Sequence, residues 1–180
     1  MLGYQQWSTG LTVGWTSSFL SDRGRYEDNP RLIGLIEREN TFESGFYINH
    51  STAAGRLSFQ LMKDVGGKHD GGDAVLKYTG DFMLGNWFIN PVVGVEWVSH
   101  DKVDANYGVS VAEATISREV YKGDDAYNMF VGIRARYELT QHWDFDYNAG
   151  LKHLDSGITD SSIVDDSTIY RTAFSLNYNF

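Results

Sequence analysis

The last thirteen residues of the chain, 168–180, alternate between apolar and polar side chains, and this pattern constrains the fold more than any other stretch. A repeat of two residues is the period of a β-strand, because successive side chains point to opposite faces of a sheet. The two sets are Tyr170, Phe174, Leu176, Tyr178 and Phe180 on one face, and Arg171, Ala173, Ser175, Asn177 and Asn179 on the other. The sequence therefore predicts a final strand with one apolar and one polar face.

The same alternation recurs along the chain. Seven further segments carry it: 7–19, 42–49, 56–63, 74–84, 87–97, 127–139 and 143–151. Glycine-rich or polar turn residues, such as the Gly85-Asn86 pair, separate neighbouring segments. Pro91 lies inside one segment, where a proline usually marks an edge or a bulge. We therefore predict an all-β fold of eight antiparallel strands.

The predicted connections alternate in length. Longer connections at 20–41, 66–72, 100–125 and 156–167 alternate with short turns at 50–55, 85–86 and 140–142. An up-and-down order of strands places every long connection at one end of the sheet and every short turn at the other. Outer-membrane barrels show this asymmetry, with short periplasmic turns and longer extracellular loops. In one long loop, Ser110 and Glu113 have the spacing of a capping box, which predicts a short helix over 111–118.

Composition excludes several other classes of protein. The net charge of -9 argues against a nucleic-acid partner, which would need clustered lysine and arginine. The chain has no cysteine, so it has no disulfide framework and no thiolate nucleophile. No apolar run approaches the ~18 residues of a membrane-spanning helix. Residues 1–15 lack a basic start followed by an apolar run, so we expect an exported form of this chain to be mature or truncated.

Alternation alone leaves open which face points outward, since a soluble lipocalin-like barrel also alternates. Aromatic residues near predicted strand ends favour a membrane barrel: Trp7, Trp87, Trp97, Tyr137, Trp143 and Tyr178. The polar face mixes small residues with charges of both signs, which suits an eight-stranded lumen with room only for side chains: Gly10, Gly14, Gly94, Gly132, Gly150, Arg134, Arg136, Glu138, Asp144 and Asp146. We predict one transmembrane barrel domain over residues 1–180.

Polar residues in the loops are of the types found in catalytic and metal-binding sites, but their presence does not require such a site. Two groups contain a histidine and an aspartate, and one of them also a serine, as serine hydrolases do, although their spacing fixes no geometry: His100 with Asp101, and His153 with Asp155 and Ser156 or Ser162. A loosely bound cation is conceivable at His69, Asp70 and Asp73, and His50 and His142 fall in predicted turns. Acidic loop residues have the charge to bridge cations to lipopolysaccharide phosphates: Asp22, Glu27, Asp28, Asp124, Asp125, Asp165 and Asp166. We predict solvated polar residues here, with no catalytic, cofactor-binding or metal site.

Four segments resemble motifs of the MipA/OmpV family of outer-membrane proteins. Residues 107–114, YGVSVAEA, resemble that family's Y-(F/Y)-G-V-S-x-x-(E/Q)-A segment, and residues 137–143 resemble its Y-x-L-(S/T)-x-x-W hairpin. Residues 160–164, DSSIV, resemble its D-S-P-I-V loop with Ser162 in place of proline. The chain also ends on an aromatic-x-Phe strand, as the family does. The resemblance covers roughly residues 42–180, and the N-terminal part is shorter than in the family.

The resemblance implies a place and a role for this chain. It implies an integral protein of the Gram-negative outer membrane, surrounded by lipid and lipopolysaccharide, whose terminal Phe180 belongs to the assembly signal. One branch of the family is described as a scaffold between a murein-degrading transglycosylase and a murein synthase, and other members are treated as porin-like or adhesive. We therefore expect a non-enzymatic scaffold for murein-remodelling enzymes. The alternatives are a small porin-like channel, a surface adhesin and a soluble ligand-binding barrel.

Overall fold

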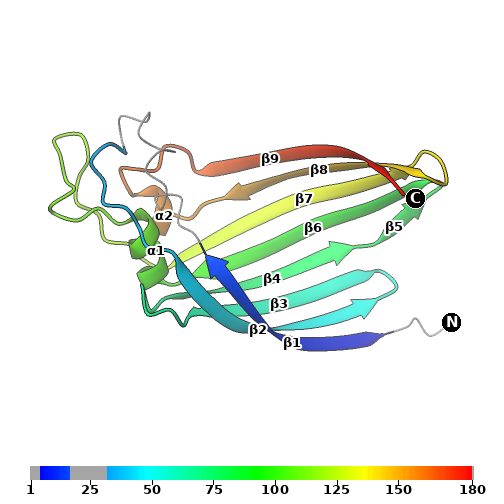
Figure 1. The fold of residues 1–180 in the computed structure, drawn as a ribbon, viewed down its shortest axis with the longest axis horizontal. Helices are drawn as coiled ribbons and strands as arrows, with labels where there is room; N and C mark the ends of the chain where they lie inside the picture. The colour runs from blue at the N-terminus through cyan, green and yellow to red at the C-terminus, as the bar shows by residue number, and fades with distance from the viewer. Residues whose placement is uncertain (1–4, 17–31, 180) are drawn as a thin grey trace.

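A computed structural model describes residues 5–16 and 32–179 as one curved antiparallel sheet with two short helices at one end (Figure 1). The strands are β1 (Gln6–Thr16), β2 (Thr41–Thr52), β3 (Gly55–Asp64), β4 (Gly72–Gly80), β5 (Phe82–Leu84), β6 (Trp87–Val98), β7 (Ala126–Glu138), β8 (Trp143–His153) and β9 (Thr168–Tyr178). The helices are α1 (His100–Tyr107) and α2 (Ser156–Thr159). Neither helix is long and apolar enough to span a membrane. Phe180 and the acidic residues Asp22, Glu27 and Asp28 lie outside the described residues.

Strands that follow one another in sequence are neighbours in the sheet. The order is β1-β2-β3-β4-β6-β7-β8-β9, with β5 paired to β6, and every pair is antiparallel. The predicted up-and-down order is therefore confirmed. The helices and the described parts of the long connections lie at one end, which we call the loop end. The short turns lie with the start of β1 and the end of β9 at the other, which we call the turn end (Figure 1).

The predicted count of eight strands is wrong, because the segment at 74–84 is divided into β4 and β5. β5 continues the register of β4 along β6. The interruption at Gly80 and Asp81 lies opposite Asn90 and Pro91, and Pro91 has no N–H to donate to the ladder. The side-chain amide of Asn90 donates instead to the Gly80 carbonyl (3.0 Å) and to the Asp81 carboxylate (2.7 Å).

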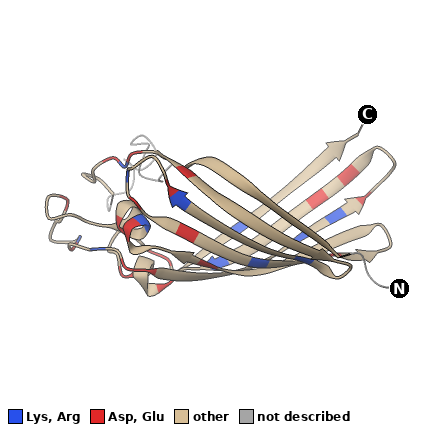
Figure 2. Ribbon diagram, turned by 90° about the horizontal axis from the view of Figure 1, so that it is seen from below, with Lys and Arg blue, Asp and Glu red and all other residues tan. Residues whose placement is uncertain are grey.

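The predicted closure into a barrel is also corrected. Among the described residues β1 pairs only with β2, and β9 pairs only with β8, so the sheet is a trough with two open edges (Figures 1 and 2). Bulky side chains occupy the inside of the trough: the Tyr47 ring lies over Gly10, and the Phe130 ring lies over Gly94.

The two faces of the sheet differ as the alternation predicts. In β1, apolar residues are exposed while Gly10, Thr12, Gly14 and Thr16 between them are partly covered. The convex face exposes large apolar side chains on every long strand, including Leu11, Trp15, Phe46, Leu57, Leu76, Val95, Val131, Leu151 and Phe174. The apolar face therefore points outward, opposite to its orientation in a soluble lipocalin-like barrel.

Aromatic rings of the convex face pair near the strand ends, as predicted. At the turn end the ring centroids of Trp87 and Tyr137 lie 4.7 Å apart. At the same end those of Trp143 and Tyr178 lie 4.9 Å apart. At the loop end Trp15 meets Phe42 edge-on at 4.5 Å. Amphipathic rings at both ends of an apolar face are the arrangement of an interfacial belt.

Most of the buried apolar side chains lie at the loop end, in a layer that we call the loop cap (residues 32–40, 65–71, 99–125 and 154–167). One cluster contains Leu32, Leu35, Val109 and Ile163. A second joins the cap to adjoining strand ends and contains Val98, Val103, Ala126, Leu154 and Ile158. The long connections are therefore packed together with cores of their own.

The helix predicted over 111–118 is absent, whereas α1 and α2 were not predicted. The side chain of Glu113 does return to the N–H of Ser110, at 2.9 Å, as in a capping box. Residues 111–113 nevertheless form only a turn, and Thr115 pairs with Arg118 in an isolated bridge. The β-branched residues of this stretch favour extended backbone, and Glu113 is drawn toward another loop by the Ile36 N–H.

Candidate functional site

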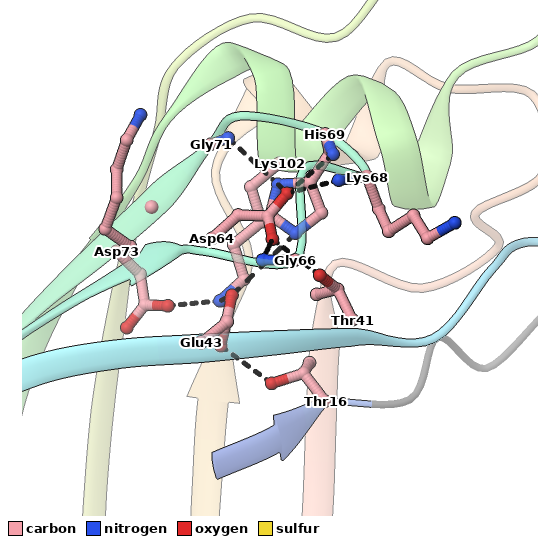
Figure 3. A network of polar contacts seen from close by, with 12 residues as sticks. Thr16, Thr41, Glu43, Asp64, Gly66, Lys68, His69, Gly71, Asp73 and Lys102 are labelled. Carbon is pink, nitrogen blue, oxygen red and sulfur yellow. Dashed lines mark hydrogen bonds and ion pairs between the residues drawn. The ribbon is translucent and has the colours of Figure 1, made fainter. Parts of the chain in front are cut away.

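Asp64 organises the loop between β3 and β4 (Figure 3). Its side chain is fully buried at the loop end of the sheet. The carboxylate accepts hydrogen bonds from the hydroxyl of Thr41 (2.5 Å) and from the backbone N–H groups of Gly66 (2.8 Å), Lys68 (2.7 Å), His69 (2.7 Å) and Asp70 (3.0 Å). These hydrogen bonds are strongest to the charged carboxylate, which offsets the cost of burying it. Asp64 is therefore a charged acceptor that fixes the loop.

Lys102 anchors α1 over the concave face of the sheet (Figure 3). Its ammonium donates to the Glu43 carboxylate at 2.6 Å and to the Asp73 carboxylate. Glu43 also accepts from the hydroxyl of Thr16 at 2.7 Å, so the network ties α1 to β1, β2 and β4. Burial lowers the pKa of Lys102, but the neighbouring carboxylates raise it overall. The ammonium stays charged, and its contacts with Glu43 and Asp73 hold α1 at the loop end of the trough.

The glycine-rich loop does not bring together the three residues considered for a cation. The ring Nδ1 of His69 accepts from the Gly71 N–H at 2.9 Å, and its Nε2 lies 3.8 Å from Glu43. Asp73 is paired with Lys102, and the backbone of Asp70 donates to Asp64. In the parts of the chain that the structure describes, no group of three or more potential ligands is close enough to hold a metal ion.

The two groups considered for serine chemistry also hold other contacts. His100 is half exposed, with Nδ1 3.2 Å from Asp125 and Nε2 3.2 Å from Asp101, and no serine is part of this group. His153 lies 3.4 Å from the hydroxyl of Thr168. The remaining members are used in the cap: Asp155 accepts from the Gly157 N–H at the start of α2 (2.9 Å), Ser156 contacts Asp155 (3.4 Å), and Ser162 donates to the Glu119 carbonyl (3.4 Å).

Glu113 joins separate loop segments of the cap. Its carboxylate accepts from the Ser110 hydroxyl (2.6 Å) and the Ile36 N–H (2.8 Å), and it pairs with Arg38 at 3.1 Å. Burial opposes the charged form, but these contacts lower the pKa of Glu113 to about 2. The buried guanidinium of Arg118 donates to the backbone carbonyl of Glu113 at 2.6 Å. Two loops far apart in sequence are therefore held by charged hydrogen bonds.

We expect the cap to loosen in acid. The pKa of Glu113 falls from 4.5 to about 2 on folding, so its contribution is present above pH 4.5 and is lost as the pH falls toward 2. The loss is on the order of 1–2 kcal/mol after allowance for solvent screening. Hydrogen exchange of the backbone amides of residues 107–121, corrected for intrinsic rates, measures this loss of stability as the pH falls. Glu113→Gln should weaken protection at pH 6 and flatten the acid dependence, whereas the control Glu119→Gln keeps both. An unchanged profile in Glu113→Gln contradicts this role.

The loop motifs meet in space. The hydroxyl of Ser161 donates to the carbonyl of Tyr107 at 2.6 Å, and Ile163 packs in the same cluster as Val109. The hairpin motif at 137–143 lies at the turn end, where the Leu139 N–H donates to the Trp143 carbonyl at 2.9 Å. The motifs at 107–114 and 160–164 therefore build the cap. Sequence reasoning missed the partners Glu43, Asp64 and Lys102. For Glu43 and Asp64 the available signal was a charged residue on the polar face at a strand end.

Some of the charges predicted for the polar face pair with one another inside the trough. Asp146 accepts from Arg136 at 3.1 Å and from Arg134 at 3.3 Å. Nearer the loop end, Lys152 pairs with Glu96 at 2.5 Å. A cavity of about 590 Å³ lies on the concave face, and a cavity of about 500 Å³ opens in the cap beside Arg38 and Lys68.

Comparison with known proteins places this sequence in a family. Residues 1–180 match the family model described as MltA-interacting protein MipA. The chain is 25% identical over 149 residues to the outer membrane protein Omp26La of Vibrio anguillarum, covering 82% of this chain and 57% of that protein. It is 24% identical over 184 residues to the MltA-interacting protein of Escherichia coli K12, covering 99% of this chain and 73% of that protein. It thus spans less than two thirds of the first relative.

No solved structure matches this chain. The family match covers the full length of the chain, the loop motifs build one packed cap, and the relatives are named as outer-membrane or MltA-interacting proteins. The chain therefore belongs to the MltA-interacting protein MipA family.

Proposed function

We propose that this protein is an integral outer-membrane protein that acts without catalysis, as a scaffold that holds a murein-remodelling enzyme at the membrane. The outward-facing apolar side chains are the observation that carries the membrane part of the proposal. The family membership and a relative named for its interaction with MltA support the partner part.

In this proposal the turn end faces the periplasm and the loop cap faces outside, with lipid and lipopolysaccharide around the sheet. Short turns at the membrane surface need a rigid arrangement to serve as a docking surface. The turn end has one, since the amide of Asn86 donates to the Glu138 carbonyl at 3.2 Å and the Asn179 N–H donates to the His142 carbonyl at 2.7 Å. A murein enzyme in the periplasm meets this end first.

The open edges of β1 and β9 set a condition on membrane insertion. Backbone N–H and C=O groups in the hydrocarbon layer have no water to bind, so an unpaired edge is strongly unfavourable there. We therefore propose that both edges are paired when the protein is inserted. A folded membrane barrel with paired edges resists dodecyl sulfate until it is heated.

We expect the chain folded in maltoside micelles to migrate differently on a dodecyl sulfate gel with and without boiling. A monodisperse, folded protein in plain buffer would contradict the membrane proposal.

A photo-crosslinking residue at Gln141 in the turn end should capture purified MltA, whereas one at the exposed Ile116 of the cap should not. Capture from neither position refutes the scaffold while membrane insertion stands. Capture from Ile116 alone refutes the proposed orientation.

A further inference from the structure

The concave face carries basic side chains that the loop cap and the scaffold proposal do not use. The cavity of about 590 Å³ is lined by Arg56, Lys77 and Arg134, with Asp81 as its one carboxylate. The adjoining hollow shares Val92 and Arg134 with it and adds Arg171. These four cations lie in a chain whose net charge is -9. Figure 2 shows basic residues along the strands between the loop end and the turn end.

Most of this positive charge is not neutralised by protein groups. Among residues 5–16 and 32–179, Lys77 and Arg171 make no ion pair or hydrogen bond. Arg56 donates only to the hydroxyl of Ser51, at 3.3 Å. Arg134 reaches Asp146 only at 3.3 Å and shares it with the closer Arg136. Lys102 and Lys152, by contrast, are tightly paired with carboxylates. A polar concave surface with unneutralised cations attracts anions.

One row of residues across the concave face holds no large side chain between two of these cations. The strand register places Arg56 and Arg171 at the two ends of one row across β3 to β9. Between them the row contains only small or medium residues: Thr79, Val92, Gly132 and Gly150. A volume of about 590 Å³ lies within the usual range of small-molecule sites.

The remaining lining residues indicate a hydroxylated ligand. Hydroxyl and amide groups surround the cations: Thr12, Tyr47, Asn49, Ser58, Gln60, Thr79 and Asn90. Such groups both donate and accept hydrogen bonds, as sugar hydroxyls require. We propose that this cavity of the concave face binds a small anionic sugar through Arg56, Lys77 and Arg134, with Arg171 in the adjoining hollow. The anionic group is a carboxylate or a phosphate, and both pair with guanidinium and ammonium groups.

The test uses the full chain folded in an uncharged maltoside at low ionic strength. Calorimetric titrations with glucuronate, glucose 6-phosphate, inorganic phosphate and glucose compare the contribution of the anionic group with that of the sugar ring. We expect at least one of the two sugar acids to bind more tightly than inorganic phosphate, glucose to bind at least tenfold more weakly than that acid, and added salt to weaken binding. The tighter acid identifies the anionic group.

The paired substitutions Arg56→Gln and Lys77→Gln should weaken binding about tenfold, because each removes one charge-assisted contact. They should leave the heat-dependent gel shift unchanged since, among the described residues, neither side chain pairs with a carboxylate. The control Lys63→Gln with Lys122→Gln removes the same charge away from this cavity and should bind as the unchanged chain does. Binding of neither acid, tighter binding of inorganic phosphate than of both acids, or an equal loss in the control overturns the proposal.

Discussion

Replacing Asp64 with alanine is expected to open the loop at 65–71 and to lower the free energy of unfolding by about 3 kcal/mol or more. The substitution removes the acceptor of four backbone N–H groups and of the Thr41 hydroxyl. Buried donors without an acceptor are costly, and charged hydrogen bonds are stronger than neutral ones. Asp64→Asn should show a smaller loss, because its amide keeps one acceptor oxygen.

Thermal unfolding in micelles measures the loss, and tryptic cleavage after Lys68 reports opening of the loop itself. Asp70→Asn is the matched control. It removes the same charge from the same loop, and asparagine tolerates the positive φ of 54° at this position. We expect this control to unfold as the unchanged chain does. Equal stability of Asp64→Ala and Asp70→Asn would show that the Asp64 network is not what holds the loop.

The second large effect is expected at the convex face. Val131 lies near the middle of β7 and is exposed on that face. If the face contacts lipid, Val131→Arg places a cation near the centre of the bilayer, at a cost of about 2–4 kcal/mol. Folding into phosphatidylcholine vesicles should therefore be strongly reduced, as measured by the fraction of heat-shifted protein.

Gln60→Arg supplies the comparison on the opposite face, since Gln60 lines the polar cavity of the trough. It should fold into vesicles with nearly unchanged yield. In a water-soluble sheet, arginine at the exposed position 131 would have little effect. Equal yields for the two variants would therefore contradict an outward lipid-facing surface.

The sequence was informative where a pattern depends only on neighbouring residues. The predicted strand at 143–151 corresponds to β8, and the face assigned to each of its residues agrees with the register to β7 and β9. The reason is that side chains alternate by covalent geometry, so one polar and one apolar set fix both the strand and its faces. The order of long and short connections then followed from the same alternation.

Sequence reasoning was less successful where a local signal competes with distant contacts. Ser110 and Glu113 have helix-capping spacing, yet Glu113 also binds Ile36 and Arg38 from another loop, and the segment forms only a turn. Pro91 was noted as an irregularity, but the division of its neighbour into β4 and β5 required knowledge of which residues lie opposite it.

The sequence by itself determined the alternating segments, their antiparallel order and the family, and it favoured the outward orientation of the apolar face. Only the tertiary structure decided that the edges of β1 and β9 remain apart and that the loops pack into a cap. It also decided the partners of the charged residues, such as Lys102 with Glu43, which are 59 positions apart. The physical reason is that alternation is set within a few residues, whereas curvature and charge pairing depend on the volumes and positions of side chains brought together from the whole chain.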